Sequence, residues 1–570
     1  LAAGTMGAAT LATFGLVGWL GVRIDILTVF LAPMVAGVGL DYAVHVLHAH
    51  DRHVRSGARP RAAMARALEE VGPAVAVAAG TTAAGLLVLA TVPAPLFARI
   101  GALGAAGVLL GFAASLTIVP AARVLLPAAA PRPRRDRLGE GFAAAGAWSL
   151  RHPRAAVALV AGPLLVAALA AATLTRVESG AADNELPADD PLLALQKRVE
   201  REYGSFQRAY LVVRGDIADA EALRALDAAT LQARTLPLWR SSSSIADLVR
   251  ADAATDEGLV DVALAPARRG DGLPETDAEA SAAIARLWRD PLWRTLAPFT
   301  VSRDATLAVV AIQLQPWEDQ HELRGLRDAL QQQAAALQAR LGPAYDVQPA
   351  GAPLNRAAVI GQTPEDVRVA VFGAAAASFA VLAAAWSRSW RTAAATAATV
   401  LVVLAACLLL LASIPALDAA YDALARLGAA ANSASLTAMF LLAFAVTACV
   451  GLDGLVQVVH RARATRDPVE ALRQTGRPVA GTALTTMAAF APLSALYFLQ
   501  SKNLAVLVAL GALYCLLLTM VLAPWIARLA IPRAKAPPSG GRQEAPAKPA
   551  AQGGAPGARP RARNVPARDR

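Results

Sequence analysis

The stretch that decides the fold is Gly37-Val38-Gly39-Leu40-Asp41-Tyr42-Ala43-Val44, which places a carboxylic acid in the middle of an apolar run. Part of it returns as Gly451-Leu452-Asp453, again inside an apolar run. A run of about 20 apolar residues can cross the hydrocarbon core of a bilayer as a helix. An acid at that depth costs at least about 2.5–3.5 kcal/mol, so an acid that occurs twice is expected to have a function.

The composition of the chain agrees with many such helices. Of the 570 residues, 56% are hydrophobic and 17% are charged, whereas soluble domains carry about 25% charged residues. A simple soluble enzyme is therefore excluded, and a polytopic α-helical membrane protein is expected. We predict ten spans, at residues 1–20, 26–48, 73–92, 97–126, 155–175, 367–386, 392–413, 436–460, 478–499 and 503–530.

Arginine is concentrated in the loops that follow every second span, at 49–72, 128–153, 387–391 and 461–477. Positively charged loops stay on the cytoplasmic side of a membrane. Both ends of the chain are therefore predicted to be cytoplasmic. The region 177–365, with 28 Asp/Glu and 19 Lys/Arg, is predicted to lie outside. The net charge of +11 then reflects membrane orientation, and no nucleic-acid partner is expected.

The outside region mixes two periodicities. Strands are expected at Ala209–Val213, Leu307–Leu314 and Tyr345–Val347, and amphipathic helices at Ala220–Arg234 and His321–Arg340. Strand–helix pairs of this size indicate one extracytoplasmic α+β domain of split βαβ type. It contains no metal-ligand cluster, nucleophile elbow or phosphate loop, so a binding or gating domain is expected.

The chain also contains an internal repeat. A shift of 412 relates Asp41 to Asp453, and a shift of 404 relates Thr81-Thr82 to Thr485-Thr486 and Pro120 to Pro524. Two copies in the same orientation form a parallel repeat, which is a transporter architecture. The second copy is preceded by a span and an outside domain that have no counterpart before residue 1. We therefore expect an N-terminally truncated part of a twelve-span protein with two outside domains.

The predicted organisation has six parts. They are an incomplete first transmembrane repeat of about four spans (1–127), a cytoplasmic Arg-rich linker (128–153), a single span (154–176), the extracytoplasmic α+β domain (177–365), a second transmembrane repeat of about five spans (366–531) and a disordered basic cytoplasmic tail (532–570).

The repeated acids are the candidate site. A carboxyl in a medium of low dielectric favours its neutral form, and a group that alternates between neutral and charged forms suits a proton-coupled machine. Asp41, Asp453 and Tyr42 are the predicted proton relay, with Tyr42 as a hydrogen-bond donor to the acid of the partner span. A purely structural lock between two hydrogen-bonded carboxyls is the alternative. The predicted supporting residues are His45, Thr81, Thr82, Thr485 and Thr486.

Neither a metal nor an organic cofactor is predicted. His45, His48, His50 and His53 follow Asp41 closely, but the last two extend past the membrane edge beside arginines, so an interfacial cluster is expected instead of a metal site. None of the four lysines follows a glycine, so no Walker A motif for ATP is present. Protons are the predicted coupling ion, and a secondary active transporter is expected instead of an enzyme.

These residues resemble a known family. The stretch from Gly37 to Val44 is similar to the Gly-rich Asp-Tyr signature of resistance–nodulation–division (RND) transporters, above all the MMPL branch. Asn184-Glu185-Leu186-Pro187-Ala188-Asp189-Asp190-Pro191 resembles the Leu-Pro-x-Asp-x-Pro start of their outside domain. The resemblance implies proton-driven export with an Asp-Tyr pair in each central span. Asp41 and Tyr42 match that pattern, while Gly454 stands where the second tyrosine would be.

The resemblance implies an exporter of lipid-like or other hydrophobic molecules in the bacterial inner membrane, driven by the proton-motive force. Two alternatives remain open at this point. One is a lipid- or sterol-binding sensing module that does not transport, and the other is a protein-translocation factor of the SecDF type. Membrane lipids and a hydrophobic cargo are the expected partners, and a homo-oligomer or accessory envelope proteins are compatible with the sequence.

Overall fold

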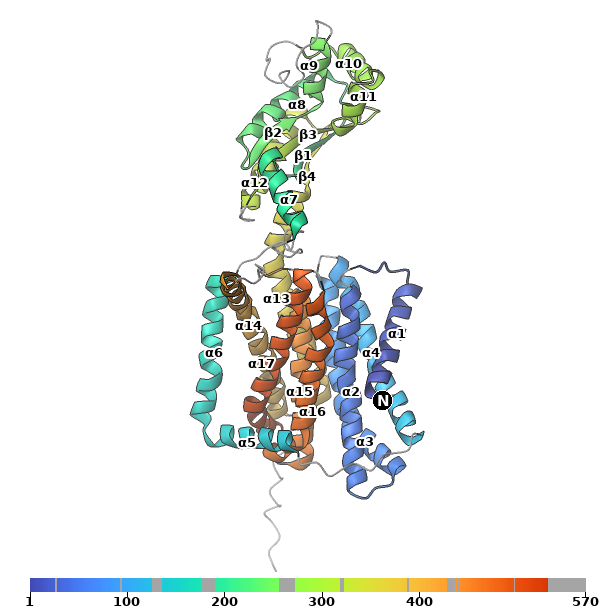
Figure 1. The fold of residues 1–570 in the computed structure, drawn as a ribbon, viewed down its shortest axis with the longest axis vertical. Coiled ribbons are helices and arrows are strands. Elements are labelled where there is room, and N and C mark those ends of the chain that lie inside the picture. Colours follow the sequence, from blue (N-terminus) through green and yellow to red (C-terminus); the bar gives the residue numbers. More distant parts are fainter. Residues whose placement is uncertain are drawn as a thin grey trace, which may run out of the picture. The chain divides into compact units, whose positions relative to one another are not determined.

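A computed structural model describes residues 1–25, 28–92, 95–125, 136–175, 190–255, 272–317, 322–386, 389–427, 434, 436–437, 440–496 and 498–531. The chain forms a bundle of long helices and an α+β domain (Figure 1). The predicted tail 532–570 and most of the motif at 184–191 lie outside the described residues. Asp190, near the end of that motif, caps helix α7 (Pro191–Tyr203) by accepting the backbone N–H of Leu192 at 2.7 Å.

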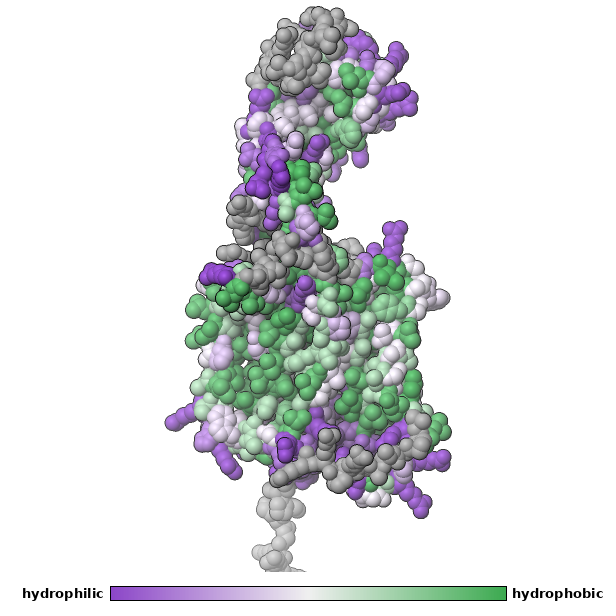
Figure 2. All heavy atoms as spheres, viewed as in Figure 1, coloured by the Kyte–Doolittle hydropathy of each residue, from purple (hydrophilic) through white to green (hydrophobic). Residues whose placement is uncertain are grey.

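In the part of the chain whose structure is described, the bundle is built from eleven helices. They are α1 (Ala2–Trp19), α2 (Leu31–Arg55), α3 (Pro60–Val88), α4 (Pro95–Leu125), α5 (Arg137–Arg151), α6 (Pro153–Leu174), α13 (Ala352–Trp386), α14 (Trp390–Arg426), α15 (Leu441–Thr465), α16 (Pro468–Phe490) and α17 (Leu499–Ala530). Among the residues with described structure, eight helices are long and apolar enough to cross a membrane. On the face shown in Figure 2, hydrophobic side chains cover the middle of the bundle, and hydrophilic side chains gather at its lower end. These features confirm a polytopic helical membrane protein.

Two of the ten expected spans do not meet that length-and-hydropathy criterion. The helices concerned are α1, expected at 1–20, and α16, expected at 478–499. Glycine and threonine lower the hydropathy of α1, and α16 carries Glu470, Arg473 and Arg477 in its first turns. Both helices nevertheless pack in the bundle, α1 against α2 and α4 and α16 against α2, α5, α15 and α17.

Part of the predicted Arg-rich linker at 128–153 is a helix. Helix α5 begins after Asp136, whose side chain accepts the N–H of Gly139, and ends at Arg151. It packs on α16 and α17, and Ser149 donates its hydroxyl to the carbonyl of Val521 at 2.7 Å. The indole N–H of Trp525 donates to Ser149 at 2.9 Å, so α5 is fastened to the second repeat.

The internal repeat is visible in the order and length of the helices. Helices α2 and α15 are each 25 residues long, and each is preceded by a phenylalanine. Helices α3 and α16 both continue into a short 3₁₀ turn, at Leu89–Thr91 and Ala491–Ala495. The packing is reciprocal, because α2 contacts α16 and α15 contacts α3. Each central helix therefore lies against the threonine-bearing helix of the other repeat.

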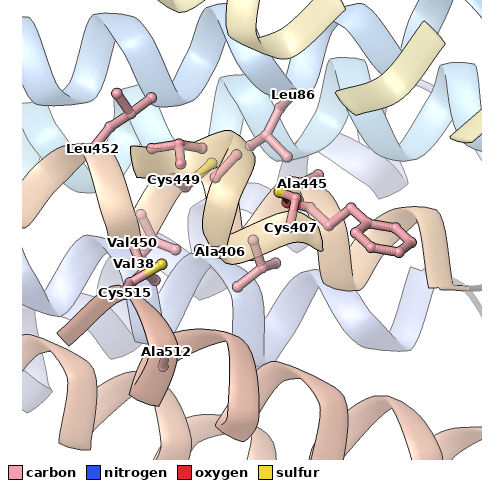
Figure 3. Packing of buried hydrophobic residues seen from close by; sticks show 14 of the residues in the cluster. Val38, Leu86, Ala406, Cys407, Ala445, Cys449, Val450, Leu452, Ala512 and Cys515 are labelled. Atoms are coloured by element: carbon pink, nitrogen blue, oxygen red, sulfur yellow. Dashed lines mark hydrogen bonds between the residues drawn. The ribbon is translucent and has the colours of Figure 1, made fainter. Parts of the chain in front are cut away.

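The apolar core of the bundle is shared between the two repeats. Val38 and Leu86 of the first repeat pack in one cluster with α14, α15 and α17 of the second (Figure 3). The three cysteines, Cys407, Cys449 and Cys515, are buried and free in this cluster. They act there as small packing side chains.

The α+β domain has a four-stranded antiparallel sheet with the strand order β2-β3-β1-β4. The elements are α7 (Pro191–Tyr203), β1 (Arg208–Arg214), α8 (Ala220–Gln232), β2 (Trp239–Ser243), α9 (Ile245–Thr255), α10 (Asp277–Arg289), α11 (Trp293–Leu296), β3 (Leu307–Leu314), α12 (Glu322–Leu341) and β4 (Asp346–Gly351). The order β1-α8-β2-β3-α12-β4, with three helices inserted after β2, is the split βαβ arrangement that the sequence predicts. The sequence did not predict β2, because this edge strand is a polar Trp-Arg-Ser-Ser-Ser segment without alternation.

Helix α13 starts directly after strand β4. Its first part packs against α12, β1 and β4, and it also contacts α3, α14 and α15. The helix passes residue 366 without a break, so the predicted boundary between the outside domain and the second repeat falls within a continuous helix.

Candidate functional site

Asp41 and Asp453 lie in the interior of the bundle, on α2 and α15. Their exposed fractions are 1% and 3%. Glycines next to them permit close helix contacts, since a Cβ on Gly37 would lie 3.1 Å from the Cβ of Ala489, and one on Gly451 would lie 2.8 Å from the sulfur of Cys515. Helices α2 and α15 contact each other, and both carboxyls are buried inside the bundle. The fold thus makes the two acid-bearing helices neighbours.

Each acid accepts a hydrogen bond from the opposite repeat. The hydroxyl of Thr485 on α16 lies 3.1 Å from Oδ1 of Asp41 and 2.9 Å from the carbonyl oxygen of Thr482, so its one proton is shared between these two acceptors. The hydroxyl of Thr82 on α3 donates to Oδ1 of Asp453 at 3.4 Å. Oδ2 of both acids is buried and has no hydrogen-bond partner among the described residues. Each carboxyl can therefore take a proton on Oδ2 while it keeps its bond to threonine.

The other threonine of each pair does not reach an acid. Thr81 donates to the carbonyl of Ala78 at 2.8 Å, which is the usual bond of a helical threonine to its own backbone. The hydroxyl of Thr486 is buried and makes no hydrogen bond to any residue whose structure is described. Of the four threonines in the sequence prediction, only Thr82 and Thr485 contact the acids.

Tyr42 lies between the two halves and has no counterpart in the second repeat. Its ring packs edge-on against Phe112, with the ring centroids 6.3 Å apart. Its hydroxyl is buried near Thr82, the threonine that donates to Asp453. At the equivalent position, a Cβ on Gly454 would already lie 3.1 Å from Val479. A side chain at this position therefore requires Val479 to move, and the site, with a tyrosine in one repeat only, is asymmetric.

The histidines after Asp41 occupy separate environments. His45 is buried, whereas His50 approaches Asp51 at 3.1 Å and His53 approaches Glu70 at 2.8 Å. The described residues contain no group of three or more His, Cys, Asp or Glu side chains arranged to hold a metal ion. His45 lies one turn after Asp41 on the buried side of α2, and His50 is buried further along the same helix.

Gln457 and Glu70 are further polar residues near the acids that the sequence did not predict. Gln457 is buried one turn after Asp453, and the shift of 412 relates it to His45, so the repeat itself was the signal that could have identified it. Glu70 is an acid near an expected span, and it forms ion pairs with residues of both repeats. The constant shift of the internal repeat does not relate Glu70 to its ion-pair partners, so the repeat gave no signal for these contacts.

Comparison with known proteins adds an independent observation. Residues 2–156 match the model of the MMPL family. This segment contains Asp41, Tyr42 and the Thr81-Thr82 pair, and the match confirms the resemblance to MMPL-type transporters of the RND superfamily.

Three relatives illustrate the range of the similarity. The chain is 33% identical to the membrane protein MJ1562 of Methanocaldococcus jannaschii, over 20% of this chain and 29% of that protein. It is 31% identical to the probable transport protein MmpL10 of Mycobacterium leprae, over 25% of this chain and 15% of that protein. It is 30% identical to the sulfolipid-1 exporter MmpL8 of Mycobacterium tuberculosis, over 25% of this chain and 13% of that protein. The matched segment thus spans less than a third of each of these relatives.

Proposed function

We propose that the protein exports lipid-like or other hydrophobic molecules across or out of the bacterial inner membrane, driven by the proton-motive force. The observation that carries the proposal is the reciprocal pair of hydrogen bonds between the repeats. Thr485 holds Asp41 and Thr82 holds Asp453, with both acids buried in the apolar core. A buried acid that is held but not neutralised by a cation is suited to gain and lose a proton.

The proposed mechanism couples the charge of these acids to the packing between the repeats. Protonation from the outside removes a charge from the centre of the bundle, which changes the contact between α2 and α15. A membrane potential supplies about 2.3 kcal/mol per elementary charge per 100 mV, so a few protons per cycle can drive an uphill transfer. Helix α13, which packs against both the sheet and the bundle, offers a mechanical link to the α+β domain.

The proposed orientation follows the arginines. The Arg-rich end of the bundle, with both ends of the chain, faces the cytoplasm, and the α+β domain lies outside. The similarity to a protein named as a sulfolipid-1 exporter supports a lipid-like cargo.

Proton flux into proteoliposomes tests the relay. With an imposed pH gradient, the protein is expected to admit protons, and Asp41→Asn and Asp453→Asn are each expected to abolish this flux. Asp422→Asn is the matched control, because Asp422 is exposed on α14. Undiminished flux in Asp41→Asn would refute the relay. Lipid binding that uncouplers do not affect would then favour a sensing module, and crosslinks to nascent chains would favour a translocation factor.

A further inference from the structure

A second polar cluster lies at the Arg-rich end of the bundle, about three turns from Asp41 along α2 and about two turns from Asp453 along α15. Its centre is Glu70 on α3, whose carboxylate forms ion pairs with Arg52 on α2 and Arg461 on α15. The ring of His53 lies 2.8 Å from Oε2 of Glu70, and the ring of His460 lies 3.1 Å from the Glu70 carbonyl oxygen. The Glu70 side chain is 19% exposed. One carboxylate thus joins the two repeats.

A cavity of about 200 Å³ is lined by this cluster and extends toward the acids as far as His45 and Gln457. Its lining includes His45, His48, Gln457, His460, Glu70 and Arg461. Along α2, the positions 41, 45, 48 and 52 share one helical face, and along α15 the positions 453, 457, 460 and 464 do the same. Both acid-bearing faces therefore continue directly into the cavity.

The cavity is suited to hold water. Nε2 of His45 and Nε2 of Gln457 are buried and have no hydrogen-bond partner among the residues described. Water in a protein interior occupies polar sites that offer two to four partners, and it takes up about 30 Å³ of liquid volume per molecule. A cavity of this size and lining accommodates several molecules, enough to connect buried groups by hydrogen bonds.

We propose that this cavity is the route by which protons pass between the paired acids and the cytoplasm, and that Glu70 is the latch that closes it. The latch holds the repeats together at the cytoplasmic end because it bridges Arg52 of the first repeat and Arg461 of the second. Without the Glu70 charge, these two guanidinium groups face each other across the interface and repel. The proton route rests on the function proposed above, whereas the latch is a property of the fold and can be tested without transport.

The latch is tested by thiol labelling in inverted membrane vesicles, in which the Arg-rich end is accessible. Ala49→Cys places a thiol on the wall of the cavity at a position that is 1% exposed, and the three native cysteines are buried. A membrane-impermeant maleimide is expected to label this thiol slowly. Adding Glu70→Gln is expected to raise the rate about tenfold or more, since a charge-assisted bond is lost. Glu69→Gln is the matched control, because it removes the same charge from an exposed neighbour that lines the same cavity.

An unchanged labelling rate in Glu70→Gln, or an equal rise in Glu69→Gln, would overturn the latch. A second test does not depend on comparing the folding of two variants. Glu70→Cys with Arg461→Cys, joined by a short bis-methanethiosulfonate, is expected to lose proton flux in proteoliposomes and to regain it on reduction. Equal flux before and after reduction contradicts the route.

Failure of the latch can be told apart from failure of the relay. If Asp41→Asn leaves the flux unchanged while Glu70→Gln opens the cavity to maleimide, the relay is refuted and the latch stands. If Asp41→Asn abolishes the flux while Glu70→Gln leaves labelling unchanged, the relay stands and the latch is refuted.

Discussion

In each threonine pair, one threonine contacts an acid and its neighbour does not. The neighbour therefore serves as the control for a mutation of the contacting threonine. Thr485 donates to Asp41 at 3.1 Å, while the hydroxyl of its neighbour Thr486 makes no hydrogen bond within the described structure. Replacing either residue by valine exchanges a hydroxyl for a methyl group at nearly constant volume. We expect Thr485→Val to slow proton-coupled transport and Thr486→Val to leave it nearly unchanged.

The size of the effect follows from the type of bond that is lost. A hydrogen bond to a charged group contributes about 1.5–3 kcal/mol, and one between neutral groups about 1 kcal/mol. Thr485→Val therefore penalises the charged form of Asp41 more than the neutral form, by about 0.5–2 kcal/mol. This difference corresponds to a decrease of about 2- to 30-fold in the rate of a cycle limited by deprotonation of Asp41.

The assay is proton flux into proteoliposomes under a fixed pH gradient, measured for the parent and both valine variants at equal protein content. Thermal unfolding in detergent confirms that each variant is folded. Equal flux in Thr485→Val and the parent would refute the assignment of Thr485 as a partner of Asp41. Equal loss in both variants would show that valine at this helix face disturbs packing, which contradicts the specific hydrogen bond.

Three further predictions concern stability, each measured by thermal unfolding of the purified chain. Burial raises the pKa of Asp247, so its carboxylate disfavours the folded state, and Asp247→Asn is expected to raise Tm at pH 7. That gain should disappear as the pH falls below the ordinary aspartate pKa of about 3.9, where Asp247 is neutral in both states. Ser149→Ala removes the acceptor of the Trp525 indole N–H and is expected to cost about 1–3 kcal/mol, as a lower Tm. Gly454→Tyr is expected to lower Tm more than Gly454→Ala, because the Cβ alone already meets Val479 at 3.1 Å.

Periodic and compositional features were predictable from the sequence. The apolar runs placed the helices of both repeats, and the β-branched segments placed β1 and β3, because these patterns repeat over many residues. Helix α5 was missed because its packed face consists mainly of small residues, such as Gly139, Ala143 and Gly146, which give a weak apolar signal. Strand β2 was missed because an edge strand needs no alternating apolar face.

The hydrogen bonds between the threonines and the acids could be predicted only in part. The repeat identified both acids and both threonine pairs, since each is a short motif at a constant offset. Which hydroxyl of each pair faces an acid depends on the rotation of α16 against α2 and of α3 against α15. The first repeat uses the second threonine, Thr82, and the second repeat uses the first, Thr485. Asp41 is the eleventh residue of α2 and Asp453 the thirteenth of α15, so the two copies are not in equal register.

The different positions of Asp41 and Asp453 along their helices have a mechanical consequence within the proposed cycle. Both the acids and the Glu70 latch join α2 and α3 to α15 or α16, so the two levels share the same interface. Arg52 lies eleven residues after Asp41, and Arg461 lies eight residues after Asp453. At a rise of about 1.5 Å per residue, the levels are about 17 Å apart along α2 and about 12 Å apart along α15. A rigid movement of α15 that breaks the bond from Thr82 to Asp453 therefore also moves Arg461, because both residues lie on this helix. In the proposed mechanism, the acid of the second repeat, which lacks a neighbouring tyrosine, is the one that controls the latch.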